Sequence, residues 1–221
     1  MGQTLKNNFD TIQRLFLTEL QKNLYITKTF YLTGGTALSA CYFNHRISED
    51  IDLFSETPFN ESLVIAFMKN VATKLHITST VVKINGRLRY DLTFPHNKLL
   101  KIDFVFYDFK HIEPVNHIGN LAVDNIGDIA VNKLLSISQR TTSKDYVDLY
   151  FILKKYTLWD LQHGVEHKFK MEIEPFYLSS LLAKADELDA LPIMKKKISL
   201  DTLKTFFLSE AKKLAEPMLK P

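Results

Sequence analysis

The sequence predicts an α/β (α+β) fold in which a mixed β-sheet flanked by helices is followed by a helical C-terminal domain. Three observations support this prediction. A strand, a glycine turn and a helix follow one another over residues 29–43, the hydrophobic period is two over residues 77–107, and a helical period returns after residue 125. We therefore expect two domains, a core over residues 1–125 and a helical domain over residues 126–221.

The first elements are predicted to be a helix, a strand and a second helix. Apolar residues recur at intervals of three and four over residues 5–20, which is the stripe of an amphipathic helix. The β-branched and aromatic run at 29–33 predicts a short strand. Gly34 and Gly35 end this strand, and the helix-forming residues 36–43 follow.

A second strand and helix come next. Apolar and acidic residues alternate over residues 50–54, which predicts a short strand with its carboxylates on one face. Pro58 opens an amphipathic helix, predicted over residues 59–75. Its Leu63 and Phe67 share the face that we expect to be buried.

Three antiparallel strands are predicted after this helix. Residues 80–84 and 87–94 flank Asn85-Gly86, which is the strongest short-range signal for a hairpin. A second turn leads to the alternating segment 100–107. The rest of the chain has helical periods, over residues 126–153 and near 157–170, 175–189 and 199–215.

The composition is that of a globular protein with a small positive charge. The chain has 221 residues, with 28 Lys and Arg against 25 Asp and Glu, and its net charge is +3. This balance allows a basic patch without demonstrating a nucleic-acid partner. The single cysteine, Cys41, excludes an intramolecular disulfide and a thiolate zinc site. Because the chain has no run of about 20 apolar residues and no apolar leader, we expect a cytoplasmic protein with no membrane partner.

The glycine turn has the composition of a phosphate-binding loop. Gly34 and Gly35 precede a helix, so the backbone can approach a polyphosphate, and the first N–H groups of the helix are unpaired. The hydroxyl of Thr36 follows directly. We expect an anion to bind here, although an ordinary turn is the alternative for two such glycines taken alone.

Three aspartates are candidate metal ligands. Asp50 and Asp52 stand two apart in a strand, so both carboxylates project from one face, where a cation is needed to neutralise them. Mg²⁺, or Mn²⁺, binds through such carboxylates together with substrate phosphates. Asp103 is predicted to lie on the polar face of a later strand. The three acids could hold two metal ions about 3.5–4 Å apart, with Asp103 acting on the nucleophile as metal ligand or general base.

Three motifs of the core form a set: Gly34-Gly-Thr-Ala-Leu38, Arg46-x-Ser48-x-Asp50-Ile-Asp52-Leu-Phe54 and Lys101-Ile-Asp103-Phe104. A helical motif follows: Asp128-Ile-Ala-Val-Asn-Lys133, then Arg140 and Lys144-Asp145-Tyr-Val-Asp148-Leu-Tyr150. Together they resemble the AbiEii/AbiGii-type nucleotidyltransferase toxins, a branch of the DNA polymerase β-like nucleotidyltransferase superfamily. The resemblance covers roughly residues 28–155.

The resemblance implies a metal-dependent nucleotidyltransferase, the toxin of a toxin–antitoxin or abortive-infection system. It implies transfer of an NMP from an NTP to an RNA acceptor such as the tRNA 3′ end, an antitoxin protein as partner, and a helical domain that closes the nucleotide cleft. The implied catalytic residues are Asp50, Asp52, Asp103, Lys133 and Asp148; the implied nucleotide-binding residues are Gly34, Gly35, Thr36, Arg46, Ser48, Lys133, Lys144 and Asp145; the implied ligands of Mg²⁺ or Mn²⁺ are Asp50, Asp52 and Asp103.

Several of these assignments have alternatives. The acidic and basic residues of the helical motif could form ordinary pairs on a helix surface. Ser48 could cap a turn. Arg87 and Arg89 could steer an RNA or a phosphate, or could pair across strands. The acceptor could be a protein or a small molecule, and the chain could be a catalytically silent module that binds a nucleotide or a partner.

Overall fold

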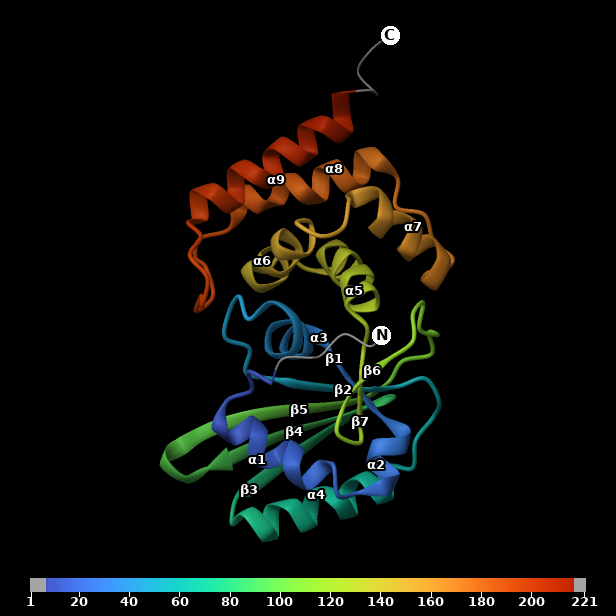
Figure 1. Cartoon of the computed structure of the whole chain (residues 1–221), viewed down its shortest axis with the longest axis vertical. Helices are drawn as coiled ribbons and strands as arrows, with labels where there is room; N and C mark the ends of the chain where they lie inside the picture. The colour runs from blue at the N-terminus through green and yellow to red at the C-terminus, as the bar shows by residue number, and fades with distance from the viewer. Residues whose placement is uncertain (1–6, 217–221) are drawn as a thin grey trace. The chain divides into compact units, whose positions relative to one another are not determined.

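The computed structural model describes residues 7–216, and these residues form two compact units (Figure 1). The first unit contains residues 7–42 and 48–125, and the second contains residues 43–47 and 126–216. From the sequence we expected a single boundary after residue 125. The structure in addition assigns the short segment 43–47 to the second unit.

The described residues of the first unit form a mixed sheet of seven strands. The strands are β1 (Tyr31–Thr33), β2 (Ile51–Ser55), β3 (Thr78–Ile84), β4 (Arg87–Phe94), β5 (Lys98–Phe106), β6 (Asn116–Ile118) and β7 (Leu121–Val123). Their order is β3-β4-β5-β2-β1-β7-β6. The pairs β2–β5 and β1–β7 are parallel, and the other neighbours are antiparallel.

The predicted hairpin and third strand are confirmed as β3, β4 and β5, whereas β6 and β7 were not predicted. These two strands have three residues each, which is too few to show an alternation. They are joined through Gly119, which has a φ of +57°.

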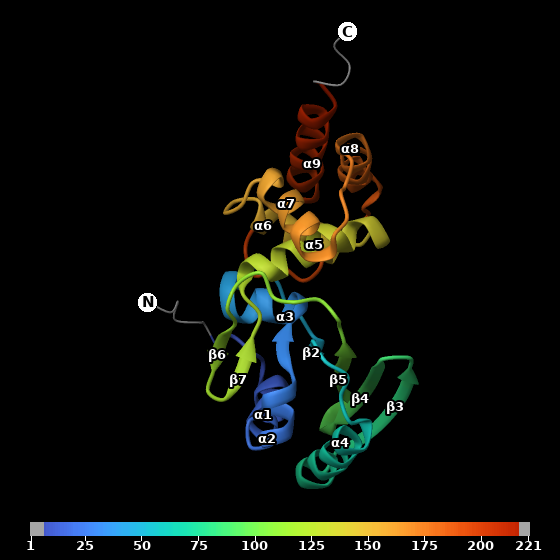
Figure 2. The ribbon, with the colours of Figure 1, turned by 90° about the vertical axis from the view of Figure 1, so that its right-hand side faces the viewer.

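Four helices lie in the described part of the first unit: α1 (Thr11–Leu20), α2 (Leu24–Thr29), α3 (Gly34–Ala37) and α4 (Glu61–Leu75). The predicted first helix begins later than expected, because Asp10 and Gln13 form a capping box there, and residues 1–6 lie outside the described part. Helix α2 was not predicted, and it ends at Thr29, where the strand was expected to begin. Helix α3 begins where β1 ends and continues as π-helix over Leu38–Phe43 (Figure 2).

One face of the sheet is apolar and covered by helices. The predicted alternation of β4 is confirmed, with Leu88 and Tyr90 buried. Phe30 packs against Phe104 of β5 with ring centroids 5.1 Å apart. Figure 1 shows α1, α2 and α4 on the same side of the sheet. The other face of β2 and β5 carries their alternate residues.

The buried face of α4 includes the predicted Phe67 but not the predicted Leu63. Leu63 is 46% exposed, whereas Val64 and Met68 are buried beside Phe67. Phe67 contacts Phe16 of α1 with ring centroids 6.2 Å apart. Residues one apart on a helix point about 100° away from each other, so Val64 faces the core where Leu63 does not.

The second unit is helical, as predicted. Its helices are α5 (Ile126–Gln139), α6 (Ser143–Ile152), α7 (Leu158–Phe169), α8 (Pro175–Ala183) and α9 (Leu200–Ala215). Helices α8 and α9 run side by side (Figures 1 and 2), and Tyr146 of α6 packs perpendicular to Phe207 of α9 with ring centroids 5.2 Å apart. Segment 43–47 is held by backbone hydrogen bonds, among them Ile47 N to Ile193 O at 2.8 Å. In the span from residue 7 to residue 216, each helix is too short or too polar to cross a bilayer.

Candidate active site

Two aspartates of the first unit lie side by side in the sheet. The register of the parallel pair β2–β5 places Asp52 directly opposite Asp103. Residues paired in this way project from the same face. Both carboxylates therefore lie on the face opposite to the buried side chains of Ile51 and Leu53. Asp50 comes immediately before β2.

The carboxylate of Asp52 occupies the space that Gly34 leaves by lacking a side chain. A Cβ atom built on Gly34 would lie 2.9 Å from Cγ of Asp52, and closer still to its Oδ2. Gly34 also has a φ of +73°, a left-handed conformation that glycine adopts without steric cost. The first glycine of the turn is thus required both by its backbone conformation and by the position of Asp52.

Polar contacts within the first unit fix the loop that carries Ser48 and Asp50. The buried Thr36 hydroxyl donates to the backbone carbonyl of Asp50 and lies 2.9 Å from the Ser48 hydroxyl. The side-chain amide of Gln13 donates to the backbone carbonyl of Ser48 at 2.7 Å. Thr36 and Ser48, which we expected to contact the nucleotide, hold this loop in place. Sequence reasoning missed Gln13, because a contact between residues 35 apart leaves no local signal.

Asp124 is a second residue that sequence reasoning missed. Its carboxylate is fully buried and accepts a hydrogen bond from the Thr33 hydroxyl at 2.7 Å. Its backbone carbonyl accepts one from the Tyr42 hydroxyl at 2.7 Å. Since Thr33 directly precedes Gly34, these bonds fix the end of β1 that leads into the glycine turn. An acid immediately after the apolar run of β7 was the available signal.

Asp103 is bonded to a neighbouring arginine. The guanidinium of Arg87 donates from Nε to Oδ1 at 2.7 Å and from Nη2 to Oδ2 at 2.6 Å, and Arg89 Nε lies 3.4 Å from Oδ1. The hydrogen bond from Arg87 to Asp103 raises the pKa of Arg87 most, burial opposes this, and the charges of Asp103, Asp52 and Asp50 raise it further. All three acids therefore act on one guanidinium. Of the two interpretations of Arg87 and Arg89, cross-strand pairing is the one that the structure supports.

The residues of this site match the requirements of a divalent cation in part. Within residues 7–216, no three or more His, Cys, Asp or Glu side chains are arranged to hold a metal ion. Of the three predicted ligands, Asp103 accepts hydrogen bonds from Arg87 at both of its oxygens. Asp50 and Asp52 supply the oxygen donors that Mg²⁺ prefers, and Asp52 is seated against Gly34.

A buried cluster of charges lies within the second unit. Asp148 is fully buried, and Arg46 donates to its two oxygens at 2.7 and 2.8 Å. His45 Nε2 lies 2.7 Å from Oδ1 of Asp148, and Lys133 Nζ lies 2.7 Å from Oδ2. Burial by itself would raise the pKa of Asp148, but the positive charges of Lys133 and Arg46 and the hydrogen bonds with Arg46 and His45 lower it.

Lys133 joins Asp148 to Asp145. The Lys133 ammonium lies 2.8 Å from Oδ1 of Asp145, whose Oδ2 accepts from Arg140 Nε at 2.7 Å. Burial lowers the pKa of Lys133, but the charges of Asp148 and Asp145 outweigh burial and raise it above its ordinary value. Lys144, which we expected beside these residues, is exposed.

Of the two interpretations of the helical motif, the structure excludes pairing on a helix surface. Its acids and Lys133 are not helix-surface pairs, because Lys133, Asp145 and Asp148 are buried. Lys133, which the resemblance assigns to the nucleotide, contacts the carboxylates of Asp145 and Asp148. Arg46 is likewise engaged with Asp148. The contacts of these residues with a nucleotide stay predictions.

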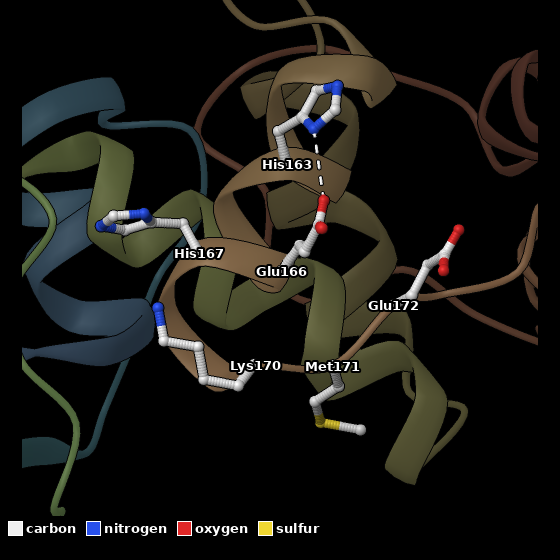
Figure 3. Close-up of a pocket in the computed structure, with 6 residues that line it drawn as sticks. All are labelled: His163, Glu166, His167, Lys170, Met171 and Glu172. Atoms are coloured by element: carbon white, nitrogen blue, oxygen red, sulfur yellow. Dashed lines mark ion pairs between the residues drawn. The ribbon is translucent and has the colours of Figure 1, made fainter.

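An open hollow beside α7 offers a second cluster of polar side chains (Figure 3). It is lined by His163, Glu166, His167, Lys170, Met171 and Glu172. His163 Nδ1 lies 3.5 Å from Glu166 Oε2, while His167 and Glu172 point apart. These side chains do not converge on a single point, so the hollow has no metal-binding geometry.

Comparison with solved structures places the fold among known ones. JHP933 of Helicobacter pylori superposes with a TM-score of 0.56 at 21% identity, over 93% of this chain and 91% of that one. A second H. pylori protein gives a TM-score of 0.60 at 22% identity, over 93% and 94% of the two chains. The nucleotidyltransferase toxin MenT4 of Mycobacterium tuberculosis gives 0.55 at 10% identity, over 95% and 85%. The chain therefore has a nucleotidyltransferase-like fold.

The chain belongs to the AbiEii family, the nucleotidyl transferase AbiEii toxins of type IV toxin–antitoxin systems, whose family model matches residues 19–216. The uncharacterised protein aq_aa25 of Aquifex aeolicus is 31% identical over 149 residues. That match covers 63% of this chain and 65% of the relative, so the chain spans less than two thirds of the relative's length. The family recognised from the motifs is thereby confirmed.

Replacing Asp148 by Asn should destabilise the protein by about 3–5 kcal/mol, because it leaves Arg46 and Lys133 buried without their counter-charge. Urea unfolding at neutral pH measures this change. The matched control is Asp189→Asn, an exposed aspartate of the same unit, which should alter the free energy of unfolding by less than about 0.5 kcal/mol. Equal effects of the two substitutions would contradict a stabilising role for the cluster.

Acid should weaken the fold through Asp145. Burial would raise the pKa of this carboxyl, but the charge of Lys133 and hydrogen bonds from Arg140, Lys133 and Thr142 lower it from 3.8 to about 2. Because the folded pKa lies below the unfolded one, the stabilisation of about 2 kcal/mol is complete above about pH 5 and is lost as the pH falls towards 2. Urea unfolding of the wild type and of Asp145→Asn across this range measures it. A wild-type pH dependence as flat as that of the variant would contradict the assignment.

Proposed function

We propose that this protein is a nucleotidyltransferase that moves an NMP from an NTP to an RNA acceptor such as the tRNA 3′ end. The observation that carries the proposal is the register of Asp52 beside Asp103, with the Asp52 carboxylate seated against Gly34. This arrangement joins two acids to a turn through which a polyphosphate can approach the backbone. Membership of the AbiEii family supports the same reaction class.

The reaction forms one bond and breaks one. The acceptor hydroxyl attacks the α-phosphorus of the NTP, the bond between the α- and β-phosphates breaks, and pyrophosphate leaves with the electron pair. Asp50 and Asp52 would hold Mg²⁺ or Mn²⁺, which when bound neutralises phosphate charge and makes the attacking hydroxyl more acidic. Asp103 would take the hydroxyl proton or become a further ligand. The chain's own contribution is mainly positioning and charge neutralisation.

We also propose roles for the helical unit and for a partner protein, the antitoxin. Within the helical unit, we assign phosphate binding to the exposed Lys144, and we assign to Lys133 and Asp148 the support of the segment that carries Arg46. A toxin of this family acts in the cytoplasm, where tRNA and NTPs are found, and a cognate antitoxin protein restrains it. MenT4 is described as a nucleotidyltransferase toxin, which supports the toxin role by analogy of fold.

A catalytically silent binding module is the second candidate. The observation that favours it is the Arg87–Asp103 pair, because both oxygens of this carboxylate are already occupied by hydrogen bonds from a guanidinium. A nucleotide could then bind at the glycine turn without transfer. Labelling separates the two candidates, because only an enzyme passes the label to an acceptor.

The test is incubation with Mg²⁺ and each α-labelled NTP in the presence of total tRNA or of cell protein. The wild type should label tRNA, and Asp50→Asn/Asp52→Asn should lose about 10²-fold or more of this activity, because the charges that stabilise the transferring phosphate are removed. Glu49→Gln is the matched control, since it removes a neighbouring exposed carboxylate outside the proposed site. It should retain activity.

Each other result has a meaning. Label in the protein fraction alone would replace RNA by a protein acceptor. Equal labelling by the wild type and the double variant would contradict the assignment of Asp50 and Asp52. NTP binding with no labelled polymer from either protein would favour the silent module.

A further inference from the structure

Arg87 reaches Asp103 from a diagonal position in the sheet. In the register of β4 and β5, Arg89 is the direct neighbour of Asp103, and Arg87 is opposite Val105. It is nevertheless Arg87 that donates two short hydrogen bonds, at 2.7 and 2.6 Å, whereas Arg89 makes one long contact of 3.4 Å. The planar fork of an arginine side chain matches a carboxylate in this two-bond geometry.

The pair is partly shielded from water and lies among like charges. The Asp103 side chain is 9% exposed and that of Arg87 is 34% exposed. Asp103 stands beside Asp52, so two carboxylates crowd one face, and adjacent like charges disfavour their common ionised state unless a cation is near. Arg87 supplies that cation from the protein itself.

A divalent ion at Asp103 needs the same oxygens. Both oxygens of Asp103 accept from Arg87, and an ion bound there would have to lie beside a fixed positive charge. Metal ion and guanidinium therefore exclude each other electrostatically, and the ion gains Asp103 only when the guanidinium leaves.

We propose that Arg87 is a positioning residue that holds Asp103 in the metal-free protein and competes with a divalent cation for it. Asp103 then becomes a metal ligand only after Arg87 has moved away, whereas Asp50 and Asp52 take the first ion. This inference rests on the proposed function, since it assumes that the site binds a divalent cation. As a consequence, the protein without nucleotide binds fewer divalent ions than its three aspartates could hold. Asp103 then binds an ion only when a nucleotide brings its own Mg²⁺.

The test is Mn²⁺ binding to the full chain without nucleotide. Binding is measured by titration calorimetry and by the loss of the electron paramagnetic resonance signal of free Mn²⁺. The wild type should bind one ion. Arg87→Ala should bind a second ion, or bind Mn²⁺ about tenfold more tightly or better, because its competitor is gone. Arg89→Ala is the matched control, since it removes the same charge from the same strand but only a 3.4 Å contact, and it should change affinity less than about threefold.

Two further variants keep the result decisive. Arg87→Lys retains the charge without the fork and should lie between the wild type and Arg87→Ala, so it gives the answer if the alanine variant does not fold. In an Asp103→Asn background, Arg87→Ala should have no effect on the second ion. Folded Arg87 variants with unchanged or weaker Mn²⁺ binding would overturn the inference.

Failure of this inference differs from failure of the proposed function. If the wild type binds Mn²⁺ and Asp50→Asn/Asp52→Asn does not, the metal site stands whatever Arg87 does. If both proteins bind Mn²⁺ equally or not at all, the proposed metal site itself is wrong, and the role of Arg87 falls with it.

Discussion

The constraint on which the first unit depends is the adjacency of two negative charges. Asp52 and Asp103 are paired across parallel strands, so neither carboxylate can turn away from the other without leaving its face of the sheet. Such a pair is stable only beside positive charge. Arg87 supplies that charge at Asp103, while Gly34 leaves room for the Asp52 carboxylate and Thr36 fixes the loop that carries Asp50. In the proposed reaction, a divalent ion bound together with a nucleoside triphosphate also supplies this positive charge.

The second unit handles buried charge in another way. Asp148 is surrounded by His45, Arg46 and Lys133, so its charge is satisfied entirely by the protein. Burial lowers the pKa of His45, the hydrogen bond and charge of Asp148 raise it, and burial prevails, which favours the neutral imidazole. This buried cluster fixes the position of segment 43–47 against α5 and α6, and removing one partner is costly because the others stay buried. The motif thus has a structural reason to be present, apart from any contact with substrate.

Sequence patterns predicted the parts of the fold that have a strong local signal. The period of two and Asn85-Gly86 predicted β3, β4 and β5, and the same alternation placed Asp103 on the polar face. Strands β6 and β7 and helix α2 were too short for a period to show. The diagonal bond of Arg87 depends on side-chain reach across the sheet, and the burial of Lys133 depends on packing between helices, so neither is visible in residue spacing. Family motifs named the class correctly but did not show how each charge is neutralised.

Diffraction can test directly whether Asp50 and Asp52 bind a divalent ion beside the glycine turn. Crystals grown with Mn²⁺ and a non-hydrolysable NTP analogue should show an anomalous peak bound by carboxylate oxygens of Asp50 and Asp52, with the triphosphate beside Gly34 and Gly35. A peak bound elsewhere, with the carboxylates of Asp50 and Asp52 making no contact to metal or nucleotide, would contradict the account.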